Sequence, residues 1–192
     1  MVTTNNALAA YEATQHLVGL GHQRISIIAG PPDISTSDER IEGFGKAMNE
    51  AGLPVREEYL KRGNFKLEEG YQCALELVKM ALPPTAIFSL NYEMTLGLMR
   101  ALAESGLECP KQISVLGFDD FVVGLDGFSW ARMFSPKLAT VAQPAYKLGR
   151  RAMEILLRKI QAQPGAEEDA DDIVRLRAEL RIRESTAPPA AP

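Results

Sequence analysis

Short apolar runs alternate with segments of helical spacing through much of the chain. Residues 24–30, 85–90 and 113–118 are apolar runs of a length typical of buried strands. Between the last two runs, Met94 and Leu98 belong to a set of apolar residues that recur on one helical face. A strand, a helix and a second strand in this order form a right-handed unit with parallel strands. We therefore predict an α/β fold, in which helices cover both faces of a mostly parallel sheet.

The same patterns predict the remaining elements. Asn5 and Asn6 precede a helix that Gly21 ends. The later elements that we expect are a helix carrying Ile41 and Phe44, a weak strand at 58–62, a helix at 67–80, a strand at 138–141, an amphipathic helix at 143–162, an acidic turn at 166–172, an edge strand of period two at 173–182 and a frayed tail at 185–192.

Polar side chains follow two neighbouring strands of the predicted sheet. Asn91 comes directly after the run 85–90, and Asp119 comes directly after the run 113–118. The carboxyl ends of parallel strands meet at one edge of a sheet, where open α/β sheets bind their ligands. Adjacent residues of an extended segment point to opposite sides, so we expect one of Asp119 and Asp120 to face the cleft and the other to cap the next turn.

Three other features leave alternatives open. Arg40 is either a surface arginine, solvated or paired with Asp38, or an arginine that reaches into the cleft to hold hydroxyls or a carboxylate. Phe65 either packs over its own loop or forms a wall of a ligand site. In the aromatic segment 121–135, Trp130 and Phe134 close the cleft, contact a subunit or simply fill space, and we favour a covering or contact role over direct ligand contact.

Composition and charge exclude several classes of protein. The chain has 192 residues, 46% of them hydrophobic, which suffices for an α/β domain. A net charge of −4 argues against direct binding of nucleic acid. Cys73 and Cys109 have no paired or metal-binding spacing, and we expect His16 and His22 to cap or pack rather than to bind metal. Neither a membrane-spanning stretch nor a signal sequence is evident, so we predict a soluble cytoplasmic protein.

Motifs of the common enzyme classes are missing from the sequence. There is no Gly-x-Ser-x-Gly elbow, no Walker loop and no Gly-x-Gly-x-x-Gly after the first strand. We therefore predict that the chain is not an enzyme and needs no cofactor.

A series of motifs resembles the lactose-repressor/galactose-repressor (LacI/GalR) family of transcription regulators. The motifs occur in the family's order along almost the whole chain: HLVGLGHQRISIIAGP at 16–31, Arg40-x-x-Gly43-Phe44, PTAIFSLN-x-x-Met94-x-x-Gly97, ISVLGFDD at 113–120, LATVAQP at 138–144 and LRIREST at 180–186. The resemblance implies a periplasmic-binding-protein-like core of two lobes that holds a small effector between them.

The resemblance implies that this chain is the carboxyl-terminal part of such a protein, without the DNA-binding headpiece and most of the first lobe. The implied segments are a remnant helix of the first lobe at 1–20, the second lobe at 21–142, a helix returning toward the first lobe at 143–165, a closing strand of the second lobe at 166–184 and a disordered tail at 185–192. Operator DNA would then be contacted only through the absent headpiece.

The family's ligand contacts can be carried over to individual residues of this chain. Arg40, Asn91 and Asp119 fall on polar contacts, Phe65 on an aromatic wall and Gln143 on a contact at the hinge between the lobes. Carboxylate, amide and guanidinium groups bind hydroxyls, and an aromatic face stacks on a ring. The resemblance therefore implies a sugar or nucleoside-like effector.

The helix that begins at Asn91 resembles the family's dimer-forming helix. Leu96 and Met99 are therefore candidates for a homodimer contact, the alternative being ordinary packing inside one chain. The chain departs from the family's pattern at Asn5-Asn6, at Asn91-Tyr92 and in a longer loop after Asp120, and the first two departures bear on effector choice. We expect an effector-sensing part of a repressor; the alternatives are a solute-binding module of a transport system and a flavodoxin-like enzyme.

Overall fold

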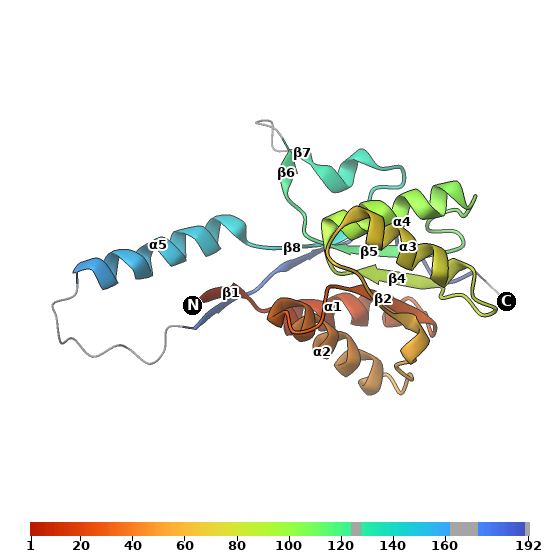
Figure 1. Ribbon diagram of the computed structural model, residues 1–192, viewed down its shortest axis with the longest axis horizontal. Helices are drawn as coiled ribbons and strands as arrows, with labels where there is room; N and C mark the ends of the chain where they lie inside the picture. Colours follow the sequence, from red (N-terminus) through yellow and green to blue (C-terminus); the bar gives the residue numbers. More distant parts are fainter. Residues whose placement is uncertain (124–127, 162–172, 191–192) are drawn as a thin grey trace.

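The computed structural model describes residues 1–123, 128–161 and 173–190 and has the α/β architecture that the sequence predicts (Figure 1). Its main sheet has six strands. In spatial order they are β10 (Glu179–Arg181), β8 (Ala139–Ala142), β5 (Ser114–Phe118), β4 (Ala86–Ser89), β2 (Ile25–Ala29) and β3 (Leu60–Arg62). All neighbours are parallel except β10 and β8, which are antiparallel.

The register of the sheet decides which side chains meet at its carboxyl edge. Ser89 near the end of β4 lies opposite Gly117 of β5, and Phe118 at the end of β5 lies opposite Val141 of β8. The three strands therefore end together. The residues that follow them lie along one edge of the sheet, as the βαβ pattern predicts.

Two pairs of helices cover the two faces of the sheet (Figure 1). The helices are α1 (Asn6–Gly19) and α2 (Ser35–Glu50) on one face, and α3 (Leu67–Val78) and α4 (Tyr92–Glu104) on the other. A short 3-10 helix, η1 (Glu57–Tyr59), precedes β3. Each pair packs closely at a glycine: a Cβ added at Gly43 would lie 2.0 Å from the Ala7 carbonyl oxygen, and one at Gly97 2.0 Å from that of Leu67.

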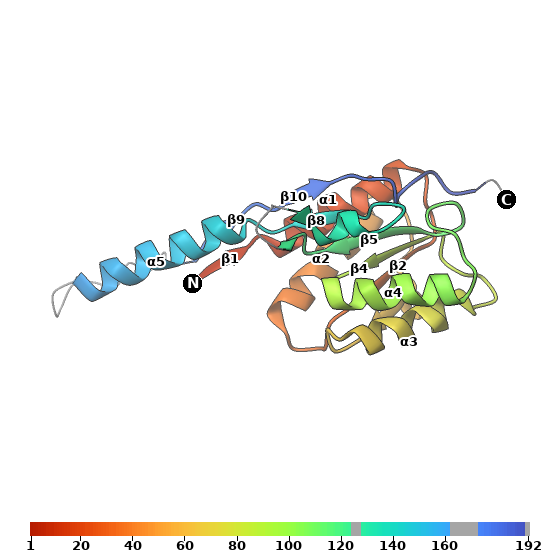
Figure 2. The same ribbon diagram turned by 90° about the horizontal axis from the view of Figure 1, so that it is seen from above.

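The helix α5 (Ala145–Gln161) extends away from the main sheet, beside a second sheet of two strands (Figures 1 and 2). The two strands, β1 (Val2–Thr4) and β9 (Val174–Leu176), are parallel. On α5 the side chain of Ile155 is buried, whereas Met153, Leu156 and Ile160 are at least half exposed. The unit formed by α5, β1 and β9 therefore presents an apolar helix surface to solvent.

The segment after β5 is more regular than the loop that we expected. It contains the antiparallel pair β6 (Val122–Val123) and β7 (Phe128–Ser129), followed by a 3-10 helix, η2 (Trp130–Met133).

The placement of residues 1–20 corrects the expected remnant of a first lobe. Ala10, Ala13 and Leu17 of α1 are fully buried in the same hydrophobic core as the main sheet. The helix α1 packs on α2 and covers the sheet, because its apolar face matches that surface. Residues 6–19 thus belong to the same packed unit as the strands that follow them.

The carboxyl-terminal segment also differs from expectation. Residues 173–182 form two short strands in two different sheets rather than one edge strand. The first, β9, pairs with β1, and the second, β10, pairs with β8; Arg177 and Ala178 lie between them. The described part of the expected frayed tail is packed: Ser185 is fully buried, and its backbone N–H donates to the Lys137 carbonyl at 3.0 Å. The expected acidic turn at 166–172 lies outside the described residues.

Candidate functional site

The side chains of Asp119 and Gln143 meet at the carboxyl edge of the sheet. Asp119 directly follows β5 and Gln143 directly follows β8, and the Gln143 amide nitrogen (Nε2) donates to Asp119 Oδ1 at 2.5 Å. The amide oxygen of Gln143 accepts a hydrogen bond from the Thr4 hydroxyl at 2.6 Å. A single side chain, from the short link between β8 and α5, therefore connects the end of β5 with β1.

Asp119 is fixed in an uncommon backbone conformation. Its φ is +75°, in the left-handed region that few residues other than glycine, asparagine and aspartate adopt. Its N–H donates to the Val141 carbonyl at 2.9 Å, and its carbonyl accepts from the indole nitrogen (Nε1) of Trp130 at 3.0 Å. The carboxylate is thereby directed toward Gln143.

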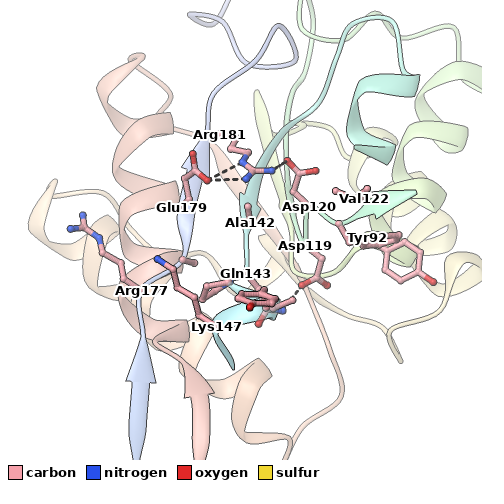
Figure 3. A pocket seen from close by; sticks show the side chains of 15 residues that line it. Tyr92, Asp119, Asp120, Val122, Ala142, Gln143, Lys147, Arg177, Glu179 and Arg181 are labelled. Carbon is pink, nitrogen blue, oxygen red and sulfur yellow. Dashed lines mark hydrogen bonds and ion pairs between the residues drawn. The ribbon is translucent and has the colours of Figure 1, made fainter. Parts of the chain in front are cut away.

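An open pocket of about 860 Å³ surrounds this pair (Figure 3). Its walls come from the ends of β5 and β8, from the start of α5 and from β10. The lining residues are Tyr92, Asp119–Val122, Ala142–Lys147, Arg177–Glu179 and Arg181. The volume is in the range of small-molecule sites, and the lining combines apolar surface with a few polar groups, as such sites do.

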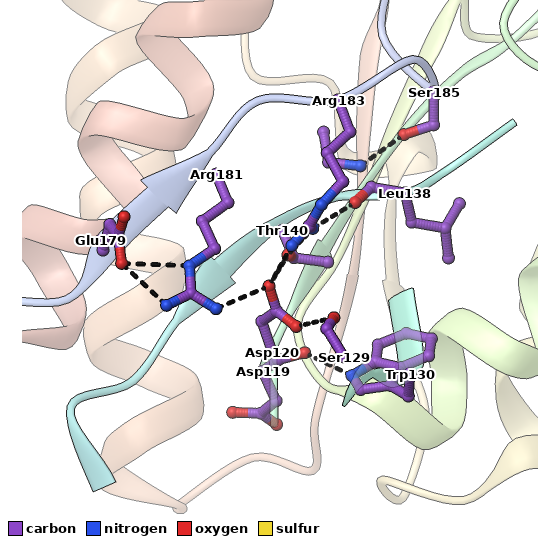
Figure 4. Close-up of polar contacts among 11 residues, drawn as sticks. Asp119, Asp120, Ser129, Trp130, Leu138, Thr140, Glu179, Arg181, Arg183 and Ser185 are labelled. Carbon is purple, nitrogen blue, oxygen red and sulfur yellow. Dashed lines mark hydrogen bonds and ion pairs between the residues drawn. The ribbon is translucent and has the colours of Figure 1, made fainter. Parts of the chain in front are cut away.

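Asp120 takes a different direction from Asp119 and joins a buried ionic network (Figure 4). Its Oδ2 accepts from Arg183 at 2.5 Å and from Arg181 at 3.2 Å. Ser129 and Thr140 also donate to the carboxylate. Burial alone raises the pKa of Asp120, but hydrogen bonds from Arg183, Ser129 and Thr140 and the charge of Arg183 outweigh it, so the pKa lies below its ordinary value.

Arg40 is neither solvated nor paired with Asp38; it is buried beneath the sheet edge. It is 5% exposed, and its guanidinium lies 3.6 Å from the centre of the Phe118 ring. It donates to Asn6 Oδ1 at 2.9 Å and to the Leu90 carbonyl at 2.5 Å. Burial lowers the pKa of Arg40 to about 10, and the negative charges of Asp119 and Glu39 limit the decrease. The guanidinium therefore stays charged at neutral pH. Arg40 thus braces the ends of β4 and β5.

Asn91 and Phe65 contact each other rather than the pocket. The Asn91 side chain caps α4 by accepting from the Met94 N–H at 2.9 Å, and its amide donates to the Phe65 carbonyl at 2.9 Å. The Phe65 ring lies over Gly30, where an added Cβ would be only 2.0 Å from ring atom Cζ. Of the five predicted ligand contacts, Asp119 and Gln143 line the pocket, whereas Arg40, Asn91 and Phe65 do not.

Tyr92 lines the pocket and was not among the predicted contacts. It is one half of Asn91-Tyr92, the position where the chain departs from the family's pattern, so a signal for it was present in the sequence. Trp130 is nearly fully buried behind the pocket, where it contacts the rings of Tyr92, Phe121 and Phe134. It packs beneath the pocket's lining, and the covering or subunit-contact role that we expected for this segment stays a prediction.

The remaining candidates lie elsewhere. Leu96 and Met99 are partly buried against the hydrophobic core, so the dimer contact stays a prediction. His22 packs among Thr85, Ser114 and Ala187, and His16 contacts Thr186. Within the described residues, no cluster of three or more metal-binding side chains occurs. The helices of residues 1–123, 128–161 and 173–190 include none that is long and apolar enough to cross a membrane.

Comparison with known proteins gives one family. The model of the periplasmic binding protein-like domain matches residues 14–186. The HTH-type transcriptional repressor PurR of Pasteurella multocida is 38% identical over 175 residues, which cover 91% of this chain and 49% of that protein. The chain spans about half the length of the curated relatives it matches.

Solved structures of LacI family regulators resemble this chain over almost its whole length. A regulatory protein of the LacI family from Chloroflexus aggregans has a TM-score of 0.84 and 32% identity, covering 96% of this chain and 62% of that one. A LacI family transcriptional regulator from Enterococcus faecium with bound ribose has a TM-score of 0.82 and 34% identity, covering 97% and 65%.

Proposed function

Because this chain belongs to the periplasmic binding protein-like domain family, in the form found in LacI/GalR regulators, we propose that it is the effector-sensing part of a cytoplasmic transcriptional repressor. The effector is a small polyhydroxylated molecule, a sugar or a nucleoside. Operator DNA is bound through a headpiece outside this chain, and the repressor is a homodimer to which Leu96 and Met99 of α4 contribute.

The observation that carries this proposal is the hydrogen-bonded pair of Asp119 and Gln143 inside the open pocket. A carboxylate and a carboxamide can accept from and donate to neighbouring hydroxyls, which is the chemistry that holds a sugar. The ribose bound to the structural neighbour from Enterococcus faecium supports this class of ligand.

The same pair supports a way to transmit binding. A hydroxyl that donates to Asp119 competes with the Gln143 amide, and Gln143 also holds Thr4 of β1. Ligand binding therefore weakens a contact between the main sheet and the unit formed by α5, β1 and β9, and this can change the position of that unit relative to the sheet. A ligand that binds one position better than another shifts the equilibrium between them.

A solute-binding module of a transport system has the same type of fold. The relatives reported above are named as transcriptional regulators, which favours regulation over transport and over an enzymatic function.

The experiment that tests this function uses the full-length protein that contains this domain, with its operator and a sugar or nucleoside that releases it. Asp119→Ala should abolish release while operator binding and the circular dichroism spectrum stay unchanged. Asp38→Ala is the matched control, because that carboxylate is exposed on the surface of α2 and its contact with Arg62 is long, at 3.9 Å. Normal effector response in Asp119→Ala would refute the proposal.

A further inference from the structure

One wall of the pocket, directly beside Asp119, is aromatic. The rings of Tyr92 and Phe121 both line the pocket and meet edge to face, with ring centres 4.8 Å apart. Phe121 is 41% exposed although it is large and apolar. Figure 3 shows the Asp119 carboxylate between Tyr92 on one side and Gln143 on the other. A charged acceptor and an apolar ring surface therefore lie side by side in one pocket.

The spacing between the wall and the carboxylate is fixed from behind by Trp130. Its ring centre lies 6.1 Å from that of Tyr92 and 6.2 Å from that of Phe121. Its indole N–H donates to the Asp119 carbonyl at 3.0 Å (Figure 4). The neighbouring Ser129 hydroxyl donates to Asp120, which anchors the segment to Arg183. Trp130 is thus a positioning residue for both parts of the pocket.

The aromatic surface of this pocket does not come from Phe65. That ring covers Gly30 at the end of β2, and Phe65 is not among the pocket's lining residues. The aromatic residues that line the pocket are Tyr92 and Phe121, which contact each other, and Tyr146 of α5, which is 81% exposed. Tyr92 lies on the side of Asp119 away from Gln143 (Figure 3), so a ligand whose hydroxyls reach both polar groups would meet Tyr92 and Phe121 with a substituent that extends past Asp119.

We propose that Tyr92 and Phe121 are specificity-determining residues, which select an effector with a flat ring attached to its hydroxylated part. A nucleoside and an aryl glycoside share this chemistry, whereas a simple sugar lacks it. The inference rests on the proposed function and adds the second half of the ligand to it. Stacking of a flat ring on an aromatic side chain should make such a ligand bind about tenfold more tightly than its sugar alone.

The test compares matched pairs of probes by isothermal titration calorimetry with this chain. The pairs are ribose with adenosine, and glucose with phenyl β-glucoside. In the unmodified chain the flat-ring member of at least one pair should bind about tenfold more tightly, and the preferred pair identifies the source of the ring. Tyr92→Leu and Phe121→Leu should each bring that ratio close to one while the affinity for the sugar stays the same.

Two further variants keep the result interpretable. Tyr92→Phe retains the ring and should retain the ratio. Tyr71→Leu, which removes a tyrosine of α3 away from the pocket, should also retain it. If Tyr92→Leu fails to fold, the affinity ratio of Phe121→Leu decides the test, because Phe121 is partly exposed and its replacement disturbs the core less.

The possible outcomes separate the two proposals. Binding of a sugar with no advantage for its flat-ring partner, or an advantage that survives both leucine variants, would overturn the aromatic wall but leave the sugar site in place. Binding of none of the four probes would overturn the inference, whereas the proposed function stands or falls on the operator-release experiment with Asp119→Ala.

Discussion

The side-chain amide of Gln143 donates to the carboxylate of Asp119 across 2.5 Å, and through this contact the end of β5 is connected to the start of α5. The two residues are 24 positions apart in sequence and meet because β5 and β8 are parallel neighbours that end in register. The pair lies where the main sheet and the unit of α5, β1 and β9 join. Any ligand held by Asp119 therefore binds beside the junction between the two parts.

Two glycines of α2 should respond in opposite ways to alanine. A Cβ at Gly43 would lie 2.0 Å from a backbone oxygen of α1, so Gly43→Ala should lower the free energy of unfolding by about 2 kcal/mol. No atom lies within 4 Å of a Cβ added at Gly45, so Gly45→Ala should raise that free energy by up to about 1 kcal/mol through helix propensity. Urea unfolding checks both, and equal effects of the two changes would show that α1 and α2 do not pack as described.

The ionic network of Asp120 should be asymmetric in its contribution to stability. The Asp120 and Arg183 side chains are 0% and 13% exposed, so Asp120→Ala leaves a charge uncompensated in the interior and should cost about 3 kcal/mol. Arg181 is 40% exposed, and its removal leaves the other partners of the Asp120 carboxylate in place. Arg181→Ala should therefore cost less than about 1 kcal/mol. Chemical denaturation of the two variants measures this difference, and a larger loss for Arg181→Ala would contradict the network.

Stability should fall as the pH drops below about 6.5, the ordinary pKa of histidine. His22 is 1% exposed, and its burial lowers its pKa in the folded state. The hydrogen bond with the Ala187 carbonyl opposes this shift in part, and the charge of His16 adds slightly to it. The unfolded chain then binds a proton that the folded chain does not, so the free energy of unfolding decreases as pH falls toward the folded-state pKa. His22→Gln should be less stable at pH 7.5 and should lose less stability between pH 7.5 and 5. An unchanged slope in this variant would show that His22 is not the group responsible.

The isolated chain should self-associate through α5. Met153, Leu156 and Ile160 are between 51% and 70% exposed on a helix, and large exposed apolar surfaces promote association. Light scattering at high protein concentration should report more than one copy, and the double variant Leu156→Glu, Ile160→Glu should restore the monomer. A monomeric unmodified chain would contradict this prediction. Association that survives the double variant would instead direct attention to Leu96 and Met99.

Local sequence patterns predicted most of the regular structure. Cap residues and apolar periodicity gave α1, α3 and the start of α4 within about two residues, because these helices bury one face against a single sheet. The pairing of β1 with β9 and the division of residues 173–182 between two sheets were missed. The pairing of β1 with β9 joins residues 172 positions apart, such as Val2 and Val174, and the short strands β9 and β10 carry no distinctive period.

The site was predicted in part for a similar reason. Asp119 was placed by the rule that ligands bind at the carboxyl ends of parallel strands, and Gln143 by the family resemblance. Arg40 could not be assigned from sequence, because its burial depends on Asn6, Leu90 and Phe118, which lie on three other elements. Tyr92 was visible as a departure from the family's pattern, but only the fold showed its contact with Phe121 and Trp130.

A crystal structure of the full-length protein with a sugar or nucleoside that releases its operator tests the central claim most directly. We predict ligand hydroxyls within hydrogen-bonding distance, about 2.6–3.2 Å, of the Asp119 carboxylate and the Gln143 amide. A ligand bound elsewhere, with the contact between Asp119 and Gln143 left as it is in the free protein, would contradict the account.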